Sequence, residues 1–444
     1  MALWHSVGVA IEHRDSPPPS PFQEFFGTEA AAGALLVVCA GVALVVANSG
    51  WADAYHRLWA TPVGAAVGGH TLSLTLHQWI NDGLMAAFFL LVGLEIKREA
   101  LAGELASPRQ AALPIAAAIG GMVVPATIYF LVSDGGLEAR GWAIPMATDI
   151  AFALGALALV APRAPSGLKI FLAALAIVDD MGAVLVIALF YTGELAWGSL
   201  GIAGTILLML VALNILGVRR LAPYLVLGLG LWFFVHESGV HATIAGVMLA
   251  MTIPTRTRIN AAEYSADARR LLDHFDRTET GDLLVLTSKG QQEAIIGLER
   301  ASEGVTAPLL RLEHALHGFS AFVVMPLFAL SNAGVSLGGS SSGSVTLAVI
   351  VGLTIGKPLG ITGAAMAAVR LRLAALPEGV SWTALHGCAW LGGIGFTMSL
   401  FIAALAFQGA SLLDSAKVGI LAGSILAGTI GAILLHRGTR GKRP

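Results

Sequence analysis

The sequence has little charge, few aromatic residues and almost no cysteine. Of its 444 residues, 12% are charged, 7% are aromatic and two are cysteines. This low charge, with a 56% hydrophobic share, is far from the average of soluble domains and predicts an integral membrane protein with no nucleic-acid partner. Few aromatics and sparse β-branched alternation argue against a lipid-facing β-barrel. Cys39 and Cys388 are too far apart in the sequence to suggest a disulfide framework or a thiolate metal motif.

What the sequence has instead is a series of apolar stretches about as long as a helix that crosses a bilayer, roughly 17–25 residues. The 53 glycines suit close helix packing and broken helices. We therefore predict an all-α polytopic membrane protein with about twelve transmembrane helices. These twelve stretches lie near residues 27–49, 78–100, 110–133, 141–161, 168–192, 197–217, 221–236, 239–254, 314–333, 345–369, 382–407 and 415–436.

The distribution of cations gives the orientation, because loops rich in Lys and Arg stay on the cytoplasmic side. If the N-terminus is inside, the inner segments hold 22 Lys and Arg residues. The outer segments then hold three, namely Arg57, Arg140 and Lys417, and Lys357 lies within a helix. We therefore expect a multi-pass membrane protein with both termini in the cytoplasm, surrounded by membrane lipid.

The composition divides the chain into five segments. Residues 255–312 are too charged to span a membrane and are expected to be a cytoplasmic insertion, partly helical or disordered. The stretch 67–79 alternates leucine with polar residues after Gly-Gly, which predicts either a hairpin or a loop on the outer face. "GGSSSGS" at 338–344 predicts a flexible outer linker. The segments are a cytoplasmic arm (1–26), helices one to eight (27–254), the insertion (255–312), helices nine to twelve (313–436) and a basic cytoplasmic tail (437–444).

Two of the apolar stretches look interrupted. In "GWAIPMATDIAFALGALAL" Pro145 precedes the polar pair Thr148-Asp149, and in "WLGGIGFTMSLFIAAL" three glycines precede Thr397. Each stretch is the middle helix of a set of three, and the two sets begin on opposite sides of the membrane, so any repeat between them would be inverted. Paired interrupted helices in inverted halves indicate a substrate site at the midplane of a secondary transporter.

Four charged residues, Asp149, Asp179, Asp180 and Lys357, fall well inside the apolar stretches. Each charge at a helix centre costs about 2.5–3.5 kcal/mol on insertion scales, so four uncompensated charges cost on the order of 10–14 kcal/mol. A buried ion pair that only fixes helix register is the alternative, but three acids and one base cannot all cancel. A water-lined functional site is the better interpretation.

Adjacent residues on a helix project about 100° apart, so Asp179 and Asp180 face different surroundings. Burial favours the protonated form of each carboxyl group, and so does the negative charge of the adjacent aspartate. The pair is therefore expected to titrate as a coupled site. Such a carboxylate can hold either a proton or a cation. Carboxylate, hydroxyl and carbonyl oxygens suit hard ions, which favours Na+ or Li+ with Thr148 and freed carbonyls completing the shell.

Two further residues have alternative interpretations. Lys357 can pair with Asp179 or lie over the negative end of a half-helix, and Asp149 can compensate the positive end of one. For the lysine, extension of the side chain to the membrane interface is the weaker alternative. His241 begins a helix near the outer face, where it is either a pH sensor or a structural residue. His386 and Cys388 face different ways, so no metal site is expected there.

Eight stretches of the sequence resemble the NhaA sodium/proton antiporters of bacteria, in order from about residue 27 to 436. The resemblance implies twelve helices, two crossed broken helices at the fourth and eleventh positions, and electrogenic exchange of more than one proton per Na+ or Li+. It implies no cofactor, since the ions are the transported substrates. The stretches are "FFLLVGLEIKREAL", "ATDIAFALGALAL", "LKIFLAALAIVDDMGAVLVIALFYT", "GVHATIAGV", "RLEHALH", "MPLFALSNAGVSL", "GKPLGI" and "GGIGFTMSLFIA".

The resemblance also implies roles for the charged residues. Asp180 looks like the cation-binding carboxylate, Asp179 like its gating and proton-carrying neighbour, and Lys357 like the charge that compensates Asp179. Asp149 and Thr148 match the residues at the break of the fourth helix.

Other matching positions bear on regulation and assembly. His241, Glu95 and Glu313 match positions that the family associates with pH activation. The stretch 67–79 matches its dimer contact, which implies a homodimer. The sequence departs from the family pattern mainly between about 255 and 310, which puts the pH response in doubt more than the ion site.

Two rival functions remain at this stage. A sodium-coupled solute symporter needs a solute pocket with further polar groups, which the sequence does not show. An intramembrane aspartyl protease needs two aspartates facing each other, usually from two helices, whereas Asp179 and Asp180 are adjacent on one helix. Sodium/proton exchange for sodium and pH homeostasis is therefore the favoured function.

Overall fold

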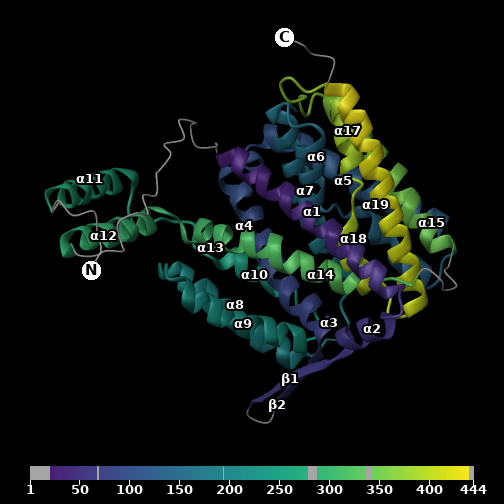
Figure 1. Cartoon of the computed structure of the whole chain (residues 1–444), viewed down its shortest axis with the longest axis horizontal. Helices are drawn as coiled ribbons and strands as arrows, with labels where there is room; N and C mark the ends of the chain where they lie inside the picture. Colours follow the sequence, from purple (N-terminus) through teal and green to yellow (C-terminus); the bar gives the residue numbers. More distant parts are fainter. Residues whose placement is uncertain (1–20, 68–69, 194, 279–287, 337–342, 440–444) are drawn as a thin grey trace, which may run out of the picture.

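The computed structural model describes residues 21–67, 70–193, 195–278, 288–336 and 343–439, and most of these are helical (Figure 1). Within them, eight segments are long and apolar enough to cross a membrane by themselves. These are α1 (Pro21–Ala47), the run α3 (Leu76–Gln78), η1 (Trp79–Leu84) and α4 (Met85–Ala102), α5 (Pro108–Val132), α7 (Ser166–Phe190), α8 (Trp197–Ile215), the run α13 (Pro308–Phe319), η5 (Ser320–Val324) and α14 (Met325–Asn332), the run α15 (Gly343–Val351), η6 (Gly352–Gly356) and α16 (Lys357–Arg370), and α19 (Ala410–Thr439).

Two further spans are broken, as the sequence predicts. The pair η3 (Glu138–Met146) and α6 (Ile150–Val160) bends by 44°, and the pair α17 (Trp382–Leu391) and α18 (Phe396–Ala406) bends by 47°. The remaining two predicted stretches are the shorter apolar helices α9 (Leu221–Glu237) and α10 (Ile244–Thr252). Every predicted stretch is therefore helical, and the polytopic helical fold is confirmed.

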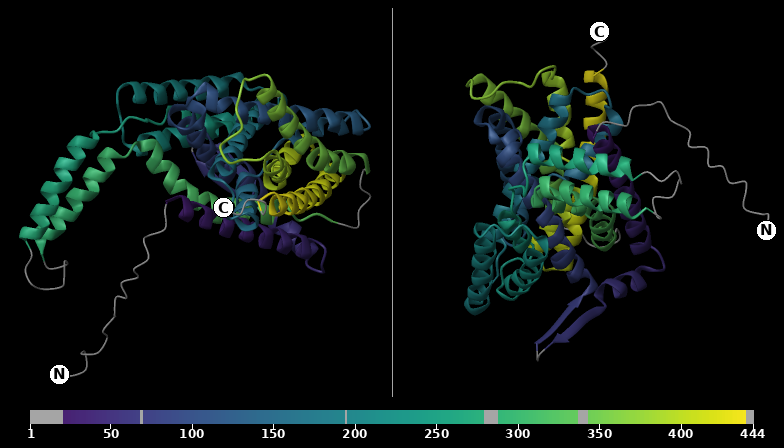
Figure 2. Two further views of the ribbon diagram at one scale, coloured as in Figure 1. Left: turned by 90° about the horizontal axis from the view of Figure 1, so that it is seen from above. Right: turned by 90° about the vertical axis from the view of Figure 1, so that its left-hand side faces the viewer.

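The short elements lie between the spans. Helix α2 (Ala52–Ala60) and the 3-10 turn η2 (Glu104–Ala106) connect neighbouring spans. Strands β1 (Pro62–Val67) and β2 (His70–Thr75) pair antiparallel and extend from one end of the bundle (Figure 2). The predicted hairpin thus exists, but its bounds are 62–75 rather than 67–79, and the Gly-Gly turn at 68–69 lies outside the described residues. The second strand ends early because Thr75 and Gln78 form a capping box that starts α3.

The charged segment between the eighth and ninth spans contains helices α11 (Ala261–Arg277) and α12 (Lys289–Val305), which pack side by side and project from the bundle (Figures 1 and 2). Both begin at a side-chain cap, Asn260 for α11 and Ser288 for α12. The described part of the predicted insertion is therefore mostly helical. The ninth span begins at Pro308, before the predicted bound of 313, because proline suits a first helical position.

The N-terminal arm, the linker with the C-terminal tail, and Lys417 also differ from the prediction or lie partly outside the described residues. Helix α1 begins at Pro21, six residues inside the segment predicted as an arm, while residues 1–20 are not described. The linker at 338–344 is described only from Gly343, where α15 starts, and the tail only to residue 439. Lys417, assigned to an outer loop by sequence, is a buried residue inside α19.

The two ends of the insertion lie next to each other, so the insertion can be deleted to test whether transport needs it. The backbone N–H groups of Arg258 and Ile259 donate to the Gly304 carbonyl at 2.8 and 3.1 Å. Replacing residues 259–303 with a short Gly-Ser linker therefore does not need to move α10 or α13. We expect the deletion variant to retain sodium-dependent proton flux in proteoliposomes, and loss of flux in a variant that elutes as a folded protein would contradict this.

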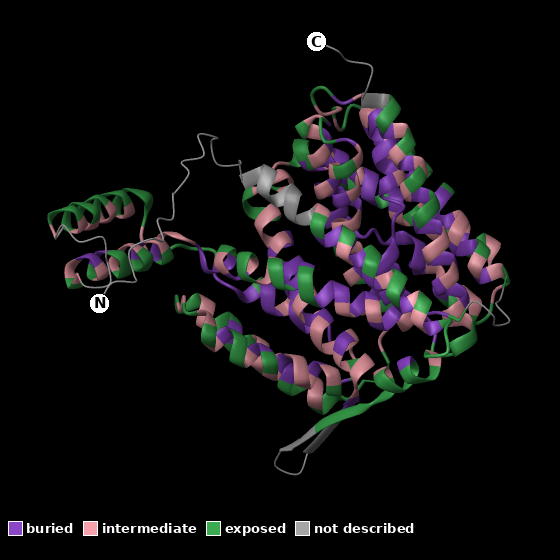
Figure 3. Ribbon diagram, in the orientation of Figure 1, coloured by how far each residue is buried: buried purple, intermediate pink, exposed green. Residues whose placement is uncertain are grey.

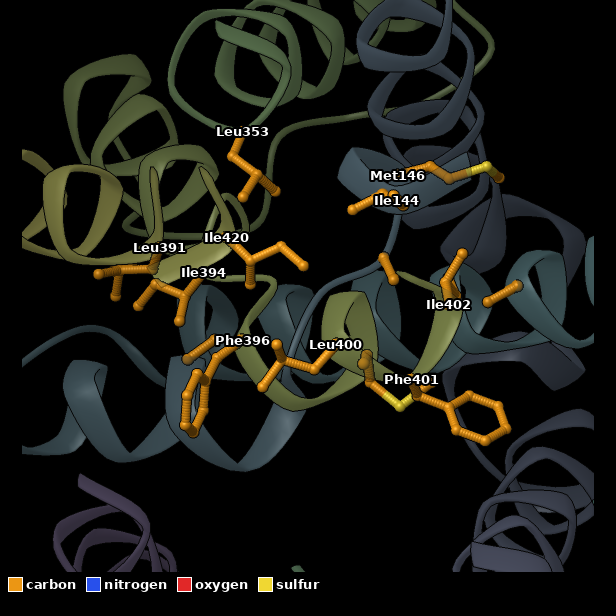
Figure 4. Close-up of a cluster of buried hydrophobic side chains, with 14 of the residues drawn as sticks. Ile144, Met146, Leu353, Leu391, Ile394, Phe396, Leu400, Phe401, Ile402 and Ile420 are labelled. Atoms are coloured by element: carbon orange, nitrogen blue, oxygen red, sulfur yellow. The ribbon is translucent and has the colours of Figure 1, made fainter. Parts of the chain in front are cut away.

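Buried side chains concentrate where the two broken spans cross the bundle, whereas α8, α11 and α12 are largely exposed (Figure 3). Apolar side chains from η3, η6, α17, α18 and α19 pack together beside the breaks (Figure 4). Close backbone contact adds to this packing, since a Cβ at Gly120 of α5 would lie 2.2 Å from the Gly360 carbonyl of α16. The core is thus built around the interrupted helices and holds them in place.

Candidate cation-binding site

The two helix breaks lie against each other, and two hydrogen bonds to backbone carbonyls join them. The Asp149 backbone N–H donates to the Ile394 carbonyl at 2.7 Å, and the Thr148 hydroxyl donates to the Gly392 carbonyl at 2.8 Å. These bonds satisfy backbone groups that a break would otherwise leave unpaired in a region without water. Non-helical backbone from residues more than 240 positions apart therefore forms one structure.

The Asp149 carboxylate accepts hydrogen bonds at the amino ends of both half-helices that follow the breaks. Its Oδ1 accepts from the Phe152 N–H of α6 at 3.0 Å, and its Oδ2 accepts from the Thr397 N–H of α18 at 3.1 Å and from the Thr397 hydroxyl. The amino end of a helix carries partial positive charge, so one carboxylate stabilises two such ends. The side chain is buried, and its charge is compensated by these donors.

Lys357 lies over the opposite, carbonyl end of a half-helix. Its ammonium donates to the Met146 carbonyl, the last residue of η3, and forms an ion pair with Asp179 Oδ2 at 2.5 Å. Both side chains are buried. The structure thus shows together the two contacts that the sequence offered as alternatives. The π-helical turn η6 directly precedes Lys357 and sets the direction in which α16 presents it.

Asp180 has a different environment from its neighbour. It is fully buried, and within the described residues neither carboxylate oxygen has a hydrogen-bond partner. Asp179 Oδ1 is likewise without a partner there, although Thr148 lies beside this carboxyl group. A buried carboxylate without donors is costly unless it binds a proton or a cation. Three acceptor oxygens therefore remain for a ligand.

The charges around Asp180 have a negative sum. Asp179, Asp149 and Glu95 act on it electrostatically, and Lys357 is the one cation among the described groups that does so. Since the ammonium is already engaged by Asp179, the surplus negative charge favours a small cation. Among the described residues, no group of three or more His, Cys, Asp or Glu is arranged like a resident metal site.

The three residues assigned by resemblance to pH response lie in different places. Glu95, on α4, is near Asp180, whereas Glu313 at the start of the ninth span pairs with Arg98 at 3.1 Å. The Nδ1 atom of His241 lies 3.0 Å from the hydroxyl of Thr243, and its Nε2 atom lies 3.9 Å from Oδ1 of Asp82. The structure therefore brings Glu95 to the ion site and leaves Glu313 and His241 in separate polar clusters.

Sequence reasoning missed two hydroxyls that hold the site together. Thr397 binds Asp149, and Ser424 of α19 accepts from the Phe396 N–H, the first residue of α18, at 3.1 Å. The three glycines before Thr397 mark the second break in the sequence, so they could have indicated this residue, although not its partner. Nothing around Ser424 in the sequence marks it, because its role depends on the packing of α19 against α18.

Comparison with known proteins shows the family of the chain. A family model described as Na+/H+ antiporter 1 matches residues 23–435. The Na(+)/H(+) antiporter NhaA of Oleidesulfovibrio alaskensis is 50% identical, over 98% of this chain and 99% of its own. That of Helicobacter pylori is 46% identical, over 93% of this chain and 94% of its own.

A solved structure supports the fold alone. The sodium proton antiporter MjNhaP1 from Methanocaldococcus jannaschii has a TM-score of 0.50 at 11% identity, with 94% of this chain and 97% of that one covered. The family match spans nearly the whole chain, and the relatives match it over nearly their whole lengths. The protein is a multi-pass integral membrane protein, and the chain belongs to the Na+/H+ antiporter 1 family.

Proposed function

We propose that this protein is a secondary active transporter that exchanges Na+ or Li+ for protons across the bacterial inner membrane, electrogenically, for sodium and pH homeostasis. The observation that carries the proposal is Asp180, a fully buried carboxylate with no hydrogen-bond partner among the described residues, beside the meeting point of two broken helices. The relatives at 45–50% identity, which are named as Na(+)/H(+) antiporters, support the same exchange.

Competition for one site couples the two ions. Asp180 holds either a proton or a cation, so the loaded and protonated forms carry the two substrates in opposite directions without both being bound. Carboxylate, hydroxyl and carbonyl oxygens suit Na+ or Li+. We assign the cation to Asp180 and Asp179, with Thr148 and Asp149 shaping the site at the break.

The ion pair between Lys357 and Asp179 supplies a second proton step. Cation binding at Asp179 requires the ammonium to leave, and its return after release restores the pair. A buried ammonium that loses its carboxylate partner gives up a proton, so the displaced Lys357 releases one proton in addition to the one that leaves Asp180. More than one proton then moves for each cation, and the exchange carries net charge. Glu95 extends this acidic cluster, while Glu313 and His241 are proposed to tune the response to pH from their separate clusters.

The arrangement of the buried residues does not favour an intramembrane protease or a solute symporter. In an aspartyl protease, two aspartates face each other across a peptide bond. Here Asp179 and Asp180 are adjacent on one helix, and Asp179 forms an ion pair with Lys357. A solute symporter needs a concave pocket of roughly 300–1,000 Å³. A cavity of about 530 Å³ does lie in the described part of the chain, but it is at the base of the insertion, between α12 and α13, and not at the buried carboxylates.

We place both termini and the insertion in the cytoplasm, on the distribution of Lys and Arg. The hairpin β1–β2 then lies on the outer face, where its free edges could pair with those of a second copy. A homodimer through this hairpin is part of the proposal, with membrane lipid as the other partner.

Proton flux in proteoliposomes tests the proposed function. An inside-acid gradient is reported by an entrapped pH dye, and Na+, Li+ or K+ is added outside. We expect Na+ and Li+ to dissipate the gradient and K+ not to do so. Because the exchange is electrogenic, clamping the membrane potential at zero should accelerate it. If Na+ leaves the gradient unchanged across the pH range, the protein is not a sodium/proton antiporter.

A further inference from the structure

A carboxylate outside the ion site lies near the end of the second span that follows the hairpin. Asp82 belongs to the π-helical turn η1, and 20% of its side chain is exposed. It precedes Glu95, the residue of this span that acts on Asp180, by thirteen residues. Thirteen residues span about 20 Å along a helix. Asp82 is therefore separate from the ion site and lies toward the outer face, where we place the hairpin.

Two histidines from other spans flank this carboxylate. Oδ2 of Asp82 lies 4.0 Å from Nδ1 of His236 on α9, and Oδ1 lies 3.9 Å from Nε2 of His241, just before α10. Both distances are too long for a hydrogen bond. Within the described residues, no hydrogen bond to the two carboxylate oxygens forms, and the Trp232 indole donates to the Asp82 backbone carbonyl instead. The gaps leave space for water or a small cation beside the oxygens.

Neighbouring side chains hold this arrangement in place. The Trp232 indole N–H lies 2.8 Å from the Asp82 carbonyl oxygen, and the same indole ring stacks on His236 with ring centroids 6.0 Å apart. Nδ1 of His241 lies 3.0 Å from the Thr243 hydroxyl, so its other nitrogen, Nε2, is turned toward Asp82. Contacts from the seventh and eighth spans therefore fix a carboxylate of the second span without hydrogen-bonding its oxygens.

A dry apolar crevice lies between this carboxylate and the ion site. Side chains of α4, α7 and α10 line it, and they leave no room for a water molecule. Two of them, Val184 and Ile187, follow Asp180 on α7 by four and seven residues, so the three share one face of the helix. The lining also includes Thr243, whose hydroxyl contacts the imidazole beside Asp82. An ion that leaves Asp180 outward along this face therefore meets Asp82 next.

We propose that Asp82 is an outer binding site for the transported cation, Na+ or Li+, occupied between Asp180 and the outer solution. The Asp82 carboxylate and water supply the ligands, because oxygen suits such hard ions better than imidazole nitrogen does. The negative charge concentrates cations at the outer end of the path and so speeds their entry. The inference rests on the proposed exchange function.

Asp82→Asn tests this site through its effect on one face of the membrane. Flux is measured in right-side-out vesicles with Na+ added at the outer face, and in everted vesicles with Na+ added at the cytoplasmic face, at constant ionic strength. At the outer face, the Na+ concentration for half-maximal flux should rise about two- to fivefold, as expected for the loss of one partly exposed ion pair. At the cytoplasmic face it should stay unchanged, because the ion reaches Asp180 there without passing Asp82.

Two matched variants separate the charge of Asp82 from other effects. Asp82→Glu keeps the carboxylate and should stay close to wild type at both faces. Asp53→Asn removes an exposed carboxylate of α2, next to the hairpin, and should also behave as wild type if general surface charge is not the cause.

The outcomes distinguish the inference from the proposed function. An equal rise at both faces in Asp82→Asn would mean that the residue supports the fold, and an unchanged outer value would remove it from the ion path. Either result would overturn the inference. Should Asp82→Asn not elute as a folded protein, Asp82→Ser makes the same test. Absence of sodium-dependent flux in the wild type would instead refute the proposed exchange.

Discussion

Replacing Asp180 with asparagine should abolish sodium-dependent proton flux. The amide has nearly the same shape but no charge, so it neither exchanges a proton nor neutralises a cation in a buried site. Removing one partner of a buried charged interaction costs about 3–5 kcal/mol, which corresponds to cation binding weaker by about two to four orders of magnitude. Flux in proteoliposomes should therefore fall to the level of liposomes without protein.

Thermal unfolding separates this loss of function from misfolding. Asp180 has no hydrogen-bond partner among the described residues, so its neutralisation removes an uncompensated buried charge and should not lower the unfolding midpoint. Asp179→Asn should lower it, because the Lys357 ammonium is left buried without its carboxylate. Asp134→Asn, an exposed position after α5, is the matched control and should be normal in both assays. Retained flux in Asp180→Asn would remove this residue from the ion site.

The helices could be located from sequence because the bilayer imposes a length and a composition on each one. Their ends could not, since local caps decide them. Thr75 and Gln78 start α3 inside a pattern that reads as a strand, and Pro308 starts the ninth span among charged residues. Such caps override periodicity over a few residues, and their strength depends on backbone geometry that an apolar pattern does not contain.

The residues of the candidate site were recognisable because a charge inside an apolar stretch is costly. Their arrangement was not. That Asp149 caps two half-helices depends on Thr397, which is 248 residues away. That Lys357 contacts Asp179 and the Met146 carbonyl together depends on how α16 packs against α5 and on the π-helical turn before it. Sequence gives the charges, and tertiary packing selects their partners.

The packing of α16 on α5 gives the second large expected effect, for Gly360→Ala. A Cβ at this position would lie 2.1 Å from the Gly120 carbonyl oxygen and 2.7 Å from its carbon. Both are backbone atoms, so no side chain can rotate away and the two helices must separate. Overpacking typically costs about 1–3 kcal/mol. We expect a lower thermal unfolding midpoint in detergent, together with strongly reduced exchange, because Lys357 lies one turn earlier on the same helix.

Gly363→Ala makes the same substitution three residues further along α16, where an added Cβ meets nothing within 4 Å. Alanine replaces glycine inside a helix with a gain of about 0.5–1 kcal/mol, so this variant should unfold at a higher temperature than wild type and exchange normally. The two variants differ only in what the new methyl group touches. Equal midpoints for both would mean that α5 and α16 are not in backbone contact, and that the position of the Lys357 ammonium depends on something other than this pair of glycines.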